Sequence, residues 1–393
     1  MGRALVTSAR TRVAYNICKS LARRGVEVVV ADAQPHAMSF HSRHAVGTAR
    51  YVSPFVDEHR FIDDLVRLVE QERIDVLIPV LEETYMVARH RDRLPARAGL
   101  CLAGYRALVE LHDKESLRTL ANRLGVPMPE TVSLAAVLAS PGMAGEMAYP
   151  QVVKPRQGGG GWAVEEVTTP DRLRALASER AASGGLAQRK LDGDTVCVAM
   201  LYDAGKMVAS DTYRVIQAYP WPYGQGTLRE SFSCPAAEQV LRTLLDAMAW
   251  TGVCEADFIV EPVSGRAFLI DVKPRFWGSL AHSLMRGMDF PYYSYKLARN
   301  ERDFRVPESA PGVVTRWLGG DVMRLGAQFV NARDKAAFLV NALRGHRRVA
   351  AYDDFDLSDP LPMLAWCCGQ ATKAVRRAWG MPTPGEGLCG QWE

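Results

Sequence analysis

The chain has 393 residues, of which 48% are hydrophobic and 23% are charged, and its formal net charge at pH 7 is +4. This composition predicts a folded globular protein of two or three domains and excludes a disordered or fibrous chain. The small net charge, without a long Lys/Arg stripe, disfavours a nucleic-acid-binding protein. No apolar run approaches the ~20 residues needed to cross a bilayer, so no transmembrane segment is expected.

The eight cysteines form no Cys-x-x-Cys pair and have no partnered histidine spacing. A disulfide framework and a cysteine metal site are therefore both disfavoured. The N-terminus lacks the apolar core of a secretory signal, because Arg3 is followed at once by a short strand-like run. Reduced thiols in the cytoplasm are the simplest expectation.

The first predicted domain, residues 1–104, alternates short apolar runs with helical stretches. The first turn of this region, residues 7–11, contains no glycine that would let the backbone approach a pyrophosphate, so a nicotinamide cofactor site is disfavoured. The alternation predicts a βαβ domain with an open parallel sheet. Strands are expected at residues 4–6, 26–31 and 76–79, and helices at 13–24 and 61–72.

The second and third predicted domains are residues 105–186 and 187–305. In the second, Asp113 and Lys114 open a helix that ends near Gly125, and four glycines, residues 158–161, connect two strands tightly. In the third, strands dominate. Further strands are expected at residues 151–154, 162–167, 187–191, 195–201, 207–216, 256–260 and 267–272, and helices at 134–138, 171–182 and 236–250.

The last predicted region, residues 306–393, is a mainly helical C-terminal extension. Helices are expected at residues 339–344 and 363–379, before a loose Pro/Gly-rich end. The second of these helices is read as amphipathic, because it combines apolar and basic side chains: Leu364, Trp366, Val375 and Trp379 with Lys373, Arg376 and Arg377. A membrane-surface helix is one interpretation, but packing against the main body or a second subunit is favoured.

Two groups of residues suggest chemistry. A glycine-rich connection directly after Lys154 suits phosphate binding, because side-chain-free backbone N–H groups can close over phosphate oxygens while the ammonium neutralises them. The alternative is an ordinary flexible loop. Asp257 lies in one strand and Asp271 ends the next, so a short hairpin would bring two carboxylates to one magnesium–nucleotide site. The alternative is a pair of solvated acids.

These motifs, in this order, resemble those of ATP-grasp ligases, in particular the group that includes carbamoyl phosphate synthase large chains and D-alanine–D-alanine ligases. The resemblance covers about residues 1–300. It implies an ATP-grasp fold of mixed α/β and α+β type, with an N-terminal Rossmann-like domain and two lobes that grip ATP. The matching segments are Asp113-Lys114, Val152-Val153-Lys154-Pro155, Gln188 to Asp194, and Asp271 to Leu280.

The resemblance also implies a role for each matching residue. The triphosphate of ATP would be held by lysines and covered by the glycine loop, adenine would lie beside the hinge segment, and Arg275 would stabilise the transferred phosphoryl group. Asp257 and Asp271 would bind Mg²⁺, with Mn²⁺ as an alternative. The implied ATP-binding residues are Lys114, Lys154, Gly158, Gly159, Gly160, Gly161, Gln188, Arg189, Lys190, Leu191 and Asp194.

One position departs from the family pattern Glu-x-Asn-Pro-Arg, because this chain has Asp271-Val272-Lys273-Pro274-Arg275. An ammonium cannot coordinate a cation, so Lys273 predicts either a site that uses fewer metals or a protein that binds nucleotide without turnover. We favour the active enzyme. The implied reaction joins a carboxylate to an amine through an acyl phosphate and releases ADP and phosphate.

The substrates are less clearly indicated. Arg214 and Arg229 flank an aromatic, proline-rich segment, residues 219–226, and either could bind a carboxylate or the acyl phosphate; the alternative is a surface arginine. The segment itself fits a substrate-covering loop or an irregular connection. His282 is expected to be structural. By analogy, one substrate is an amino acid or a small peptide, and a homodimer remains open.

Overall fold

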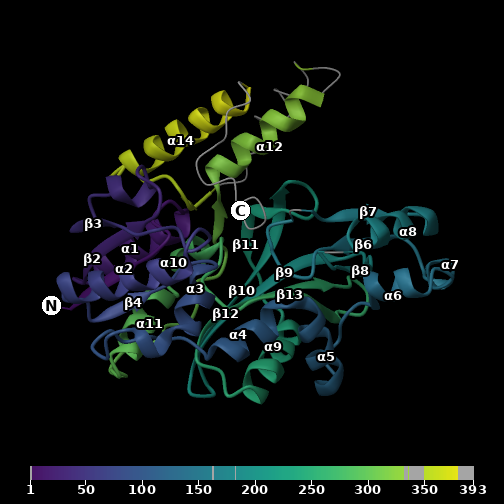
Figure 1. Ribbon diagram of the computed structural model, residues 1–393, viewed down its shortest axis with the longest axis horizontal. Helices are drawn as coiled ribbons and strands as arrows, with labels where there is room; N and C mark the ends of the chain where they lie inside the picture. Colours follow the sequence, from purple (N-terminus) through teal and green to yellow (C-terminus); the bar gives the residue numbers. More distant parts are fainter. Residues whose placement is uncertain (1, 162, 182, 332–334, 336–348, 379–393) are drawn as a thin grey trace.

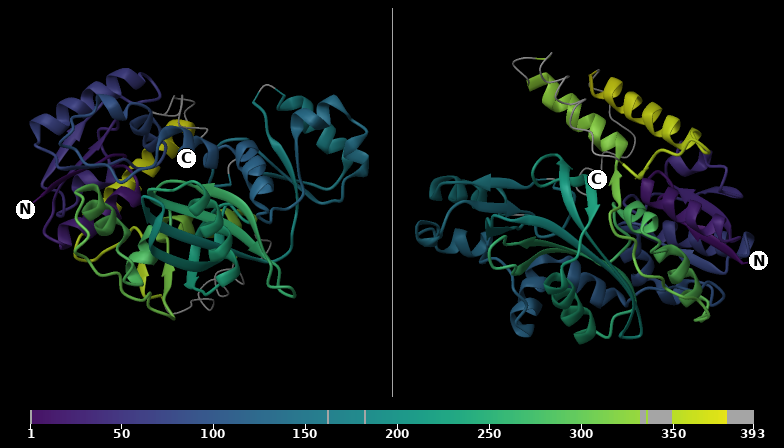
Figure 2. Two further views of the ribbon diagram at one scale, coloured as in Figure 1. Left: turned by 90° about the horizontal axis from the view of Figure 1, so that it is seen from below. Right: turned by 180° about the vertical axis from the view of Figure 1, so that it is seen from behind.

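A computed structural model describes residues 2–378, apart from residues 162, 182, 332–334 and 336–348 (Figure 1). The described chain contains a parallel sheet, a small antiparallel sheet and a large, mainly antiparallel sheet. Figure 2 shows the small sheet and its helices standing apart at one end of the molecule, with the parallel sheet at the other. None of the described helices is long and apolar enough to cross a membrane.

The parallel sheet has the strand order β3-β2-β1-β4 and forms the N-terminal domain. Its central strands are apolar on both faces, and each face lies in a different hydrophobic cluster. This confirms the predicted βαβ arrangement, although β3 was not predicted. The elements are β1 (Arg3–Val6), α1 (Arg12–Arg23), β2 (Glu27–Asp32), η1 (Met38–His41), β3 (Gly47–Arg50), α2 (Glu58–Gln71), β4 (Val76–Ile78), α3 (Glu83–Arg89) and η2 (Arg91–Arg93).

The small sheet has the order β5-β8-β6-β7 and its own hydrophobic core, formed by residues between Leu134 and Ala187. All of its pairings are antiparallel. The predicted connection of glycines joins β6 to β7, and the predicted helices and strands here are confirmed within a few residues. The elements are β5 (Thr131–Ser133), α6 (Leu134–Ala139), α7 (Met143–Glu146), β6 (Gln151–Lys154), β7 (Glu165–Val167), α8 (Pro170–Glu179) and β8 (Leu186–Arg189).

The large sheet has the order β13-β12-β9-β10-β11-β14-β15. Two of its strands, β14 and β15, belong to the region past residue 305, where only helices were expected. Each is so short that it has no sequence signal of its own. The strands are β9 (Asp194–Asp203), β10 (Lys206–Tyr219), β11 (Gln225–Ser231), β12 (Gly252–Val260), β13 (Ala267–Lys273), β14 (Val314–Arg316) and β15 (Ala351–Tyr352).

Helices cover the large sheet and join it to the N-terminal domain. Helices α4 and α5 share one hydrophobic cluster with α9, the parallel sheet and the large sheet, and they lie outside the core of the small sheet. The Asp113 side chain accepts a bond from Ser116 N at 3.0 Å and caps α5, which places Lys114 at its first residue. These helices are α4 (Tyr105–His112), α5 (Lys114–Leu124), α9 (Pro235–Ala247), α10 (Leu280–Met285) and α11 (Phe290–Ala298).

The C-terminal region adds two long helices that rise side by side at the top of Figure 1, α12 (Leu318–Asn331) and α14 (Leu361–Ala378). The helix expected at residues 363–379 is confirmed up to residue 378, and it packs on η1 of the N-terminal domain. This contact favours the interpretation that the helix packs against the main body. The helix expected at residues 339–344 lies outside the described residues.

Candidate active site

A single cavity of about 1180 Å³ lies where the small sheet, the large sheet, the N-terminal domain and the C-terminal helices meet. The site residues predicted from the sequence come from segments that span about 160 positions. In the structure, all of them line this cavity. They are Lys114, Lys154, Gly158, Gly159, Gly160, Gly161, Gln188, Arg189, Lys190, Leu191, Asp194, Arg214, Asp257, Asp271, Lys273 and Arg275.

The glycine loop between β6 and β7 needs glycine for conformation and for space. Gly158, Gly160 and Gly161 have φ angles of 108°, 72° and 77°, in the region that side chains disfavour. A Cβ on Gly161 would lie 2.3 Å from the carbonyl oxygen of Tyr223 in the β10–β11 loop. The glycine loop therefore passes directly against the loop of the large sheet, over the cavity.

Two buried lysines stand below this loop. The Lys114 ammonium donates to the Gly158 carbonyl at 2.7 Å and lies 3.3 Å from Asp271 Oδ1. Lys154 donates to the Gln188 amide oxygen at 2.8 Å and to the Ile270 carbonyl at 2.7 Å, both of which are uncharged. Burial, together with the charge of Lys114, lowers the pKa of Lys154 to about 8. Lys154 is thus a buried cation that an incoming anion would stabilise.

The hinge segment, residues 188–194, runs from β8 into β9. Its backbone is partly committed to the small sheet, since Arg189 N donates to Glu130 O at 2.8 Å and Lys190 N donates to Pro150 O at 3.0 Å. The Lys190 ammonium, expected in solvent or beside the nucleotide, pairs with Glu166 at 2.9 Å. Tyr223 donates to the same carboxylate at 2.7 Å, so three side chains tie the two lobes together beside the glycine loop.

The two arginines considered as substrate ligands have different surroundings. Arg214 lines the cavity but pairs with Asp194 at 2.7 Å and with Glu230, so its guanidinium holds two acids in place. Arg229 is fully buried, and both of its terminal nitrogens donate to Asp353 at 2.7 Å. Both interpretations of Arg229 were wrong: it is neither a surface arginine nor a cavity residue. Arg229 ties β11 to the C-terminal region. His282, expected to be structural, is buried and lies 2.9 Å from Thr315 Oγ1.

The acid wall is formed by the antiparallel strands β12 and β13. Asp257 stands opposite Asp271 and Glu255 stands opposite Lys273, which confirms that the hairpin brings both aspartates together. Glu255 was not predicted. Its signal was its position two residues before Asp257, which places both side chains on one face of the strand.

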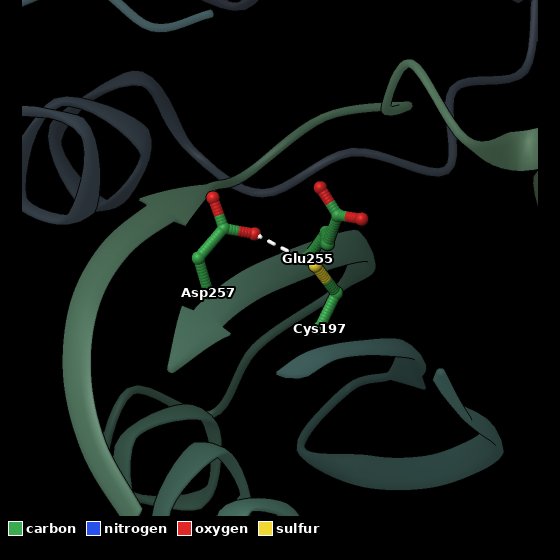
Figure 3. A group of neighbouring side chains, drawn as sticks. All are labelled: Cys197, Glu255 and Asp257. Atoms are coloured by element: carbon green, nitrogen blue, oxygen red, sulfur yellow. Dashed lines mark hydrogen bonds between the residues drawn. The ribbon is translucent and has the colours of Figure 1, made fainter. Parts of the chain in front are cut away.

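The Lys273 ammonium lies between two carboxylates, 2.9 Å from Glu255 Oε2 and 2.7 Å from Asp257 Oδ2. The other oxygens of the two acids are also engaged. Tyr213 donates to Glu255 Oε1, and the Cys197 thiol donates to Asp257 Oδ1 at 3.2 Å (Figure 3). Lys273 is therefore held inside a closed hydrogen-bond network, and its ammonium faces the acids on its own wall.

The charges of this wall shift one another's pKa values. Burial lowers the pKa of Lys273, but the charges of Asp257 and Glu255 outweigh it and hold that pKa well above its usual value. Burial raises the pKa of Glu255. For Asp271, burial acts upward, yet Lys114 and Lys273 bring the pKa below its usual value. At neutral pH, Lys273 is charged and Asp271 is ionised.

Arg275 reaches the cavity from the turn that follows β13. Its Nη2 lies 3.3 Å from Glu82 of the N-terminal domain, and its Nη1 donates to the carbonyl of Phe276 at 3.1 Å. Within the described residues its Nε is buried and has no hydrogen-bond partner. The guanidinium is thus anchored on one side and keeps an unused donor.

The far end of the cavity contains residues that the sequence did not indicate. Arg12 donates to Gln225 at 2.7 Å and to the Gly278 carbonyl at 3.1 Å, and its guanidinium lies 3.8 Å from the centre of the Trp317 ring. Trp366 of α14 lines the same end. Burial lowers the pKa of Arg12 to about 10. This end combines two indole rings with a buried cation, and it joins the N-terminal domain to the C-terminal helices.

The sequence resembles that of a known protein, although it matches no family model. The chain is similar to the N-terminal section of the carbamoyl phosphate synthase large chain of Methanopyrus kandleri, with 23% identity over 286 residues, which are 66% of this chain and 48% of that protein. The chain therefore spans about half the length of this relative.

The fold of the chain is similar to that of solved ligase, synthetase and biotin carboxylase structures. The L-amino acid ligase of Bacillus licheniformis has a TM-score of 0.64 and 15% identity, over 80% of this chain and 78% of that one. The N5-carboxyaminoimidazole synthetase of Staphylococcus aureus, complexed with ADP, has a TM-score of 0.66 and 14% identity, over 84% and 86%. The biotin carboxylase domain of Hydrogenobacter thermophilus 2-oxoglutarate carboxylase, with MgADP, has values of 0.62 and 16%, over 79% and 73%.

The chain has the ATP-grasp fold, which confirms the fold expected from the sequence resemblance.

Proposed function

We propose that this protein is an ATP-dependent ligase that joins a carboxylate to an amine through an acyl phosphate, releasing ADP and phosphate. One observation carries the proposal: a single cavity is lined by two buried lysines and the glycine loop, which suit phosphate, and by the acid wall that ends in Arg275. Phosphoryl transfer depends mainly on such positioning and charge, and both walls supply them.

In this proposal ATP lies between the two lobes. Lys114 and Lys154 contact its phosphates, and the glycines at 158–161 close over them. Adenine lies beside the segment Gln188 to Leu191, and Asp194 faces the ribose. Arg214 acts on this end as a positioning residue, because its ion pair with Asp194 fixes that carboxylate.

The acid wall fits a divalent metal. Asp257 and Asp271 are register partners on adjacent strands, they line the same cavity, and oxygen ligands of this kind are what Mg²⁺ prefers; Mn²⁺ is the alternative. Asp271 is ionised at neutral pH for the reasons given above. When bound there, the metal would neutralise phosphate charge. Lys114, 3.3 Å from Asp271, would approach the same phosphates.

The reaction has two steps. A carboxylate oxygen of the first substrate attacks the γ-phosphorus, and the bond from that phosphorus to the bridging oxygen breaks, so ADP leaves with the electron pair. The amine nitrogen then attacks the acyl carbon, the carbon–oxygen bond to phosphate breaks, and the amine proton passes to solvent. Arg275, with its unused buried Nε, would stabilise the charge on the transferred phosphoryl group and on the acyl phosphate.

The far end of the cavity would hold the carboxylate and amine substrates, with an amino acid or a small peptide as the proposed class. Trp317 and Trp366 provide apolar surfaces for a side chain, and the buried Arg12 adds a positive charge nearby. A small-molecule substrate agrees with a cavity of this volume.

The test measures ADP and phosphate release with MgATP and pooled carboxylates and amines. Release that needs both a carboxylate and an amine, and that Arg275→Gln reduces without weakening ATP binding, is the expected result. The rival function is a nucleotide-binding protein without turnover, which the ion pair between Lys273 and Asp257 favours. Tight ATP binding with no release from any pool would establish the rival and reject the ligase.

A further inference from the structure

Three ligand-type side chains gather at the acid wall in the manner of a metal site, two from β12 and one from the neighbouring strand β9. The ligand atoms of Cys197, Glu255 and Asp257 all lie within 4.8 Å of one another (Figure 3). The position between the two carboxylates is already taken, because Lys273 Nζ lies 2.7 and 2.9 Å from them. The cluster therefore contains a cation that belongs to the chain itself.

We propose that the ammonium of Lys273 is the resident cation of the Glu255–Asp257 pair, so that the nucleotide-bound protein takes up one divalent metal, beside Asp271. Removing the ammonium opens a second metal site formed by Glu255, Asp257 and Cys197. This inference rests on the nucleotide binding in the proposed function, and it fixes how many metals accompany the nucleotide.

The geometry shows why the lysine stays in place. Lys273 stands opposite Glu255 in the β12–β13 register, so its side chain lies on the same face as both acids. Tyr213 and Cys197 donate to the remaining carboxylate oxygens and orient them toward the ammonium. A divalent ion would have to displace a fixed ammonium that makes two contacts at 2.9 Å or less.

The charges of the acid wall explain why a metal would bind once the ammonium is removed. With Lys273 present, two carboxylates share one positive charge on the wall. Without it, two largely buried carboxylates, with 3% and 19% of their side-chain surfaces exposed, face each other with no cation. Such a pair is costly unless it is protonated or binds a metal. Oxygen ligands and a thiol at this spacing suit a divalent ion, and the thiol in particular suits a soft one.

The experiment counts bound Mn²⁺ by the electron paramagnetic resonance of the free ion, with ADP at saturation, so turnover is not needed. The native chain is expected to bind one nucleotide-dependent Mn²⁺, and Lys273→Met to bind two. Lys273→Arg keeps the charge and should remain at one. Lys296→Met is the matched control, because Lys296 also pairs with two acids, Glu301 and Asp303, but lies outside the cavity.

A second measurement needs no nucleotide. Cd²⁺ added to Lys273→Met should produce the ultraviolet absorption band of a thiolate–metal bond, and Cys197→Ser in that background should abolish it. Two Mn²⁺ ions in the native protein, or a folded Lys273→Met that gives neither a second Mn²⁺ nor the cadmium band, would overturn the inference. If the native chain bound no Mn²⁺ with ADP, the proposed function would fail, while the cadmium band would still test the cluster.

Discussion

Two buried cations in this protein have opposite surroundings. Lys154, in the cavity wall beside the glycine loop, donates to an amide oxygen and a carbonyl oxygen, neither of which is charged. Arg229, where β11 meets the C-terminal region, donates with both terminal nitrogens to the two oxygens of Asp353, and both side chains are fully buried. Both side chains are buried, but only Arg229 contacts an acid directly.

This difference in partners distinguishes a cation suited to bind a ligand, Lys154, from a structural cation, Arg229. A buried charge with a complete partner stabilises only the contact that it already makes, and removing one member leaves the other unpaired. A buried charge held by neutral groups is destabilised in the free protein, as the lowered pKa of Lys154 shows. The negative charge of a bound phosphate would stabilise it. The unpaired cation therefore indicates the ligand site.

The largest effect is expected at the paired cation. Arg229→Met removes both 2.7 Å bonds to the buried Asp353 and leaves that carboxylate only the Arg12 contact at 3.5 Å, so the free energy of unfolding should fall by about 3–5 kcal/mol. Arg214→Met is the matched control: that arginine pairs with two acids, Asp194 and Glu230, but its side chain is 29% exposed, and a loss of about 0–1 kcal/mol is expected. Urea unfolding of both variants measures the difference, and equal losses would remove the distinction drawn from burial.

At the unpaired cation, binding should change and stability should not fall. Lys154→Met removes a charge-assisted contact to phosphate, so ADP affinity should fall about 10- to 100-fold, which corresponds to ~1.5–3 kcal/mol. Below pH 8 the buried ammonium opposes folding, because its folded pKa is below the usual 10.5, so the melting temperature without nucleotide should stay constant or rise. Calorimetric titration and thermal melting test both parts; a lower melting temperature with unchanged affinity would make Lys154 structural.

The sequence could predict one of these cations and not the other. Lys154 is followed at once by Pro155 and the glycines, so its motif is contiguous and visible. The partner of Arg229 is 124 residues away, and no local pattern links them. The pairing of Lys273 with Glu255 likewise depends on the register between two strands, which the sequence alone did not supply.

The elements of the fold that have a local sequence signal were predictable, and the others were not. Long apolar strands such as β9 and a capped helix such as α5 carry local signals, and both were found near their true bounds. Strands β14 and β15 have three and two residues and exist only because they pair with the edge of the large sheet. The far end of the cavity, with Arg12 beside Trp317, joins segments too distant for any motif to reveal.

The titration of Lys154 predicts how nucleotide binding depends on pH. ADP binds the charged ammonium, and the free protein loses that proton as the pH rises through about 8. Affinity should therefore be constant below pH 7 and fall about tenfold by pH 9. Lys154→Arg keeps its charge over this range and should remove the dependence. Titrations at several pH values measure it, and an equal decline in both proteins would assign the proton to another group.

The smallest effect is expected where exposed side chains tie the lobes together. Tyr223 and Lys190 both contact Glu166 beside the glycine loop, and these contacts lower the pKa of that carboxyl. Such contacts are worth about 0.5 kcal/mol, so Tyr223→Phe should raise the KM for ATP about two- to threefold and leave kcat unchanged. Tyr202→Phe, which removes a similar 2.8 Å bond to Asp246 away from the cavity, should change neither constant.

A double-mutant cycle shows whether Tyr223 acts through the carboxylate. In a Glu166→Gln background, Tyr223→Phe should have a smaller effect on KM than in the native chain, because the charged acceptor is gone. An undiminished effect would mean that the Tyr223 hydroxyl acts through a group other than this carboxylate, and the contact between the two lobes at Glu166 would then play no part in ATP binding.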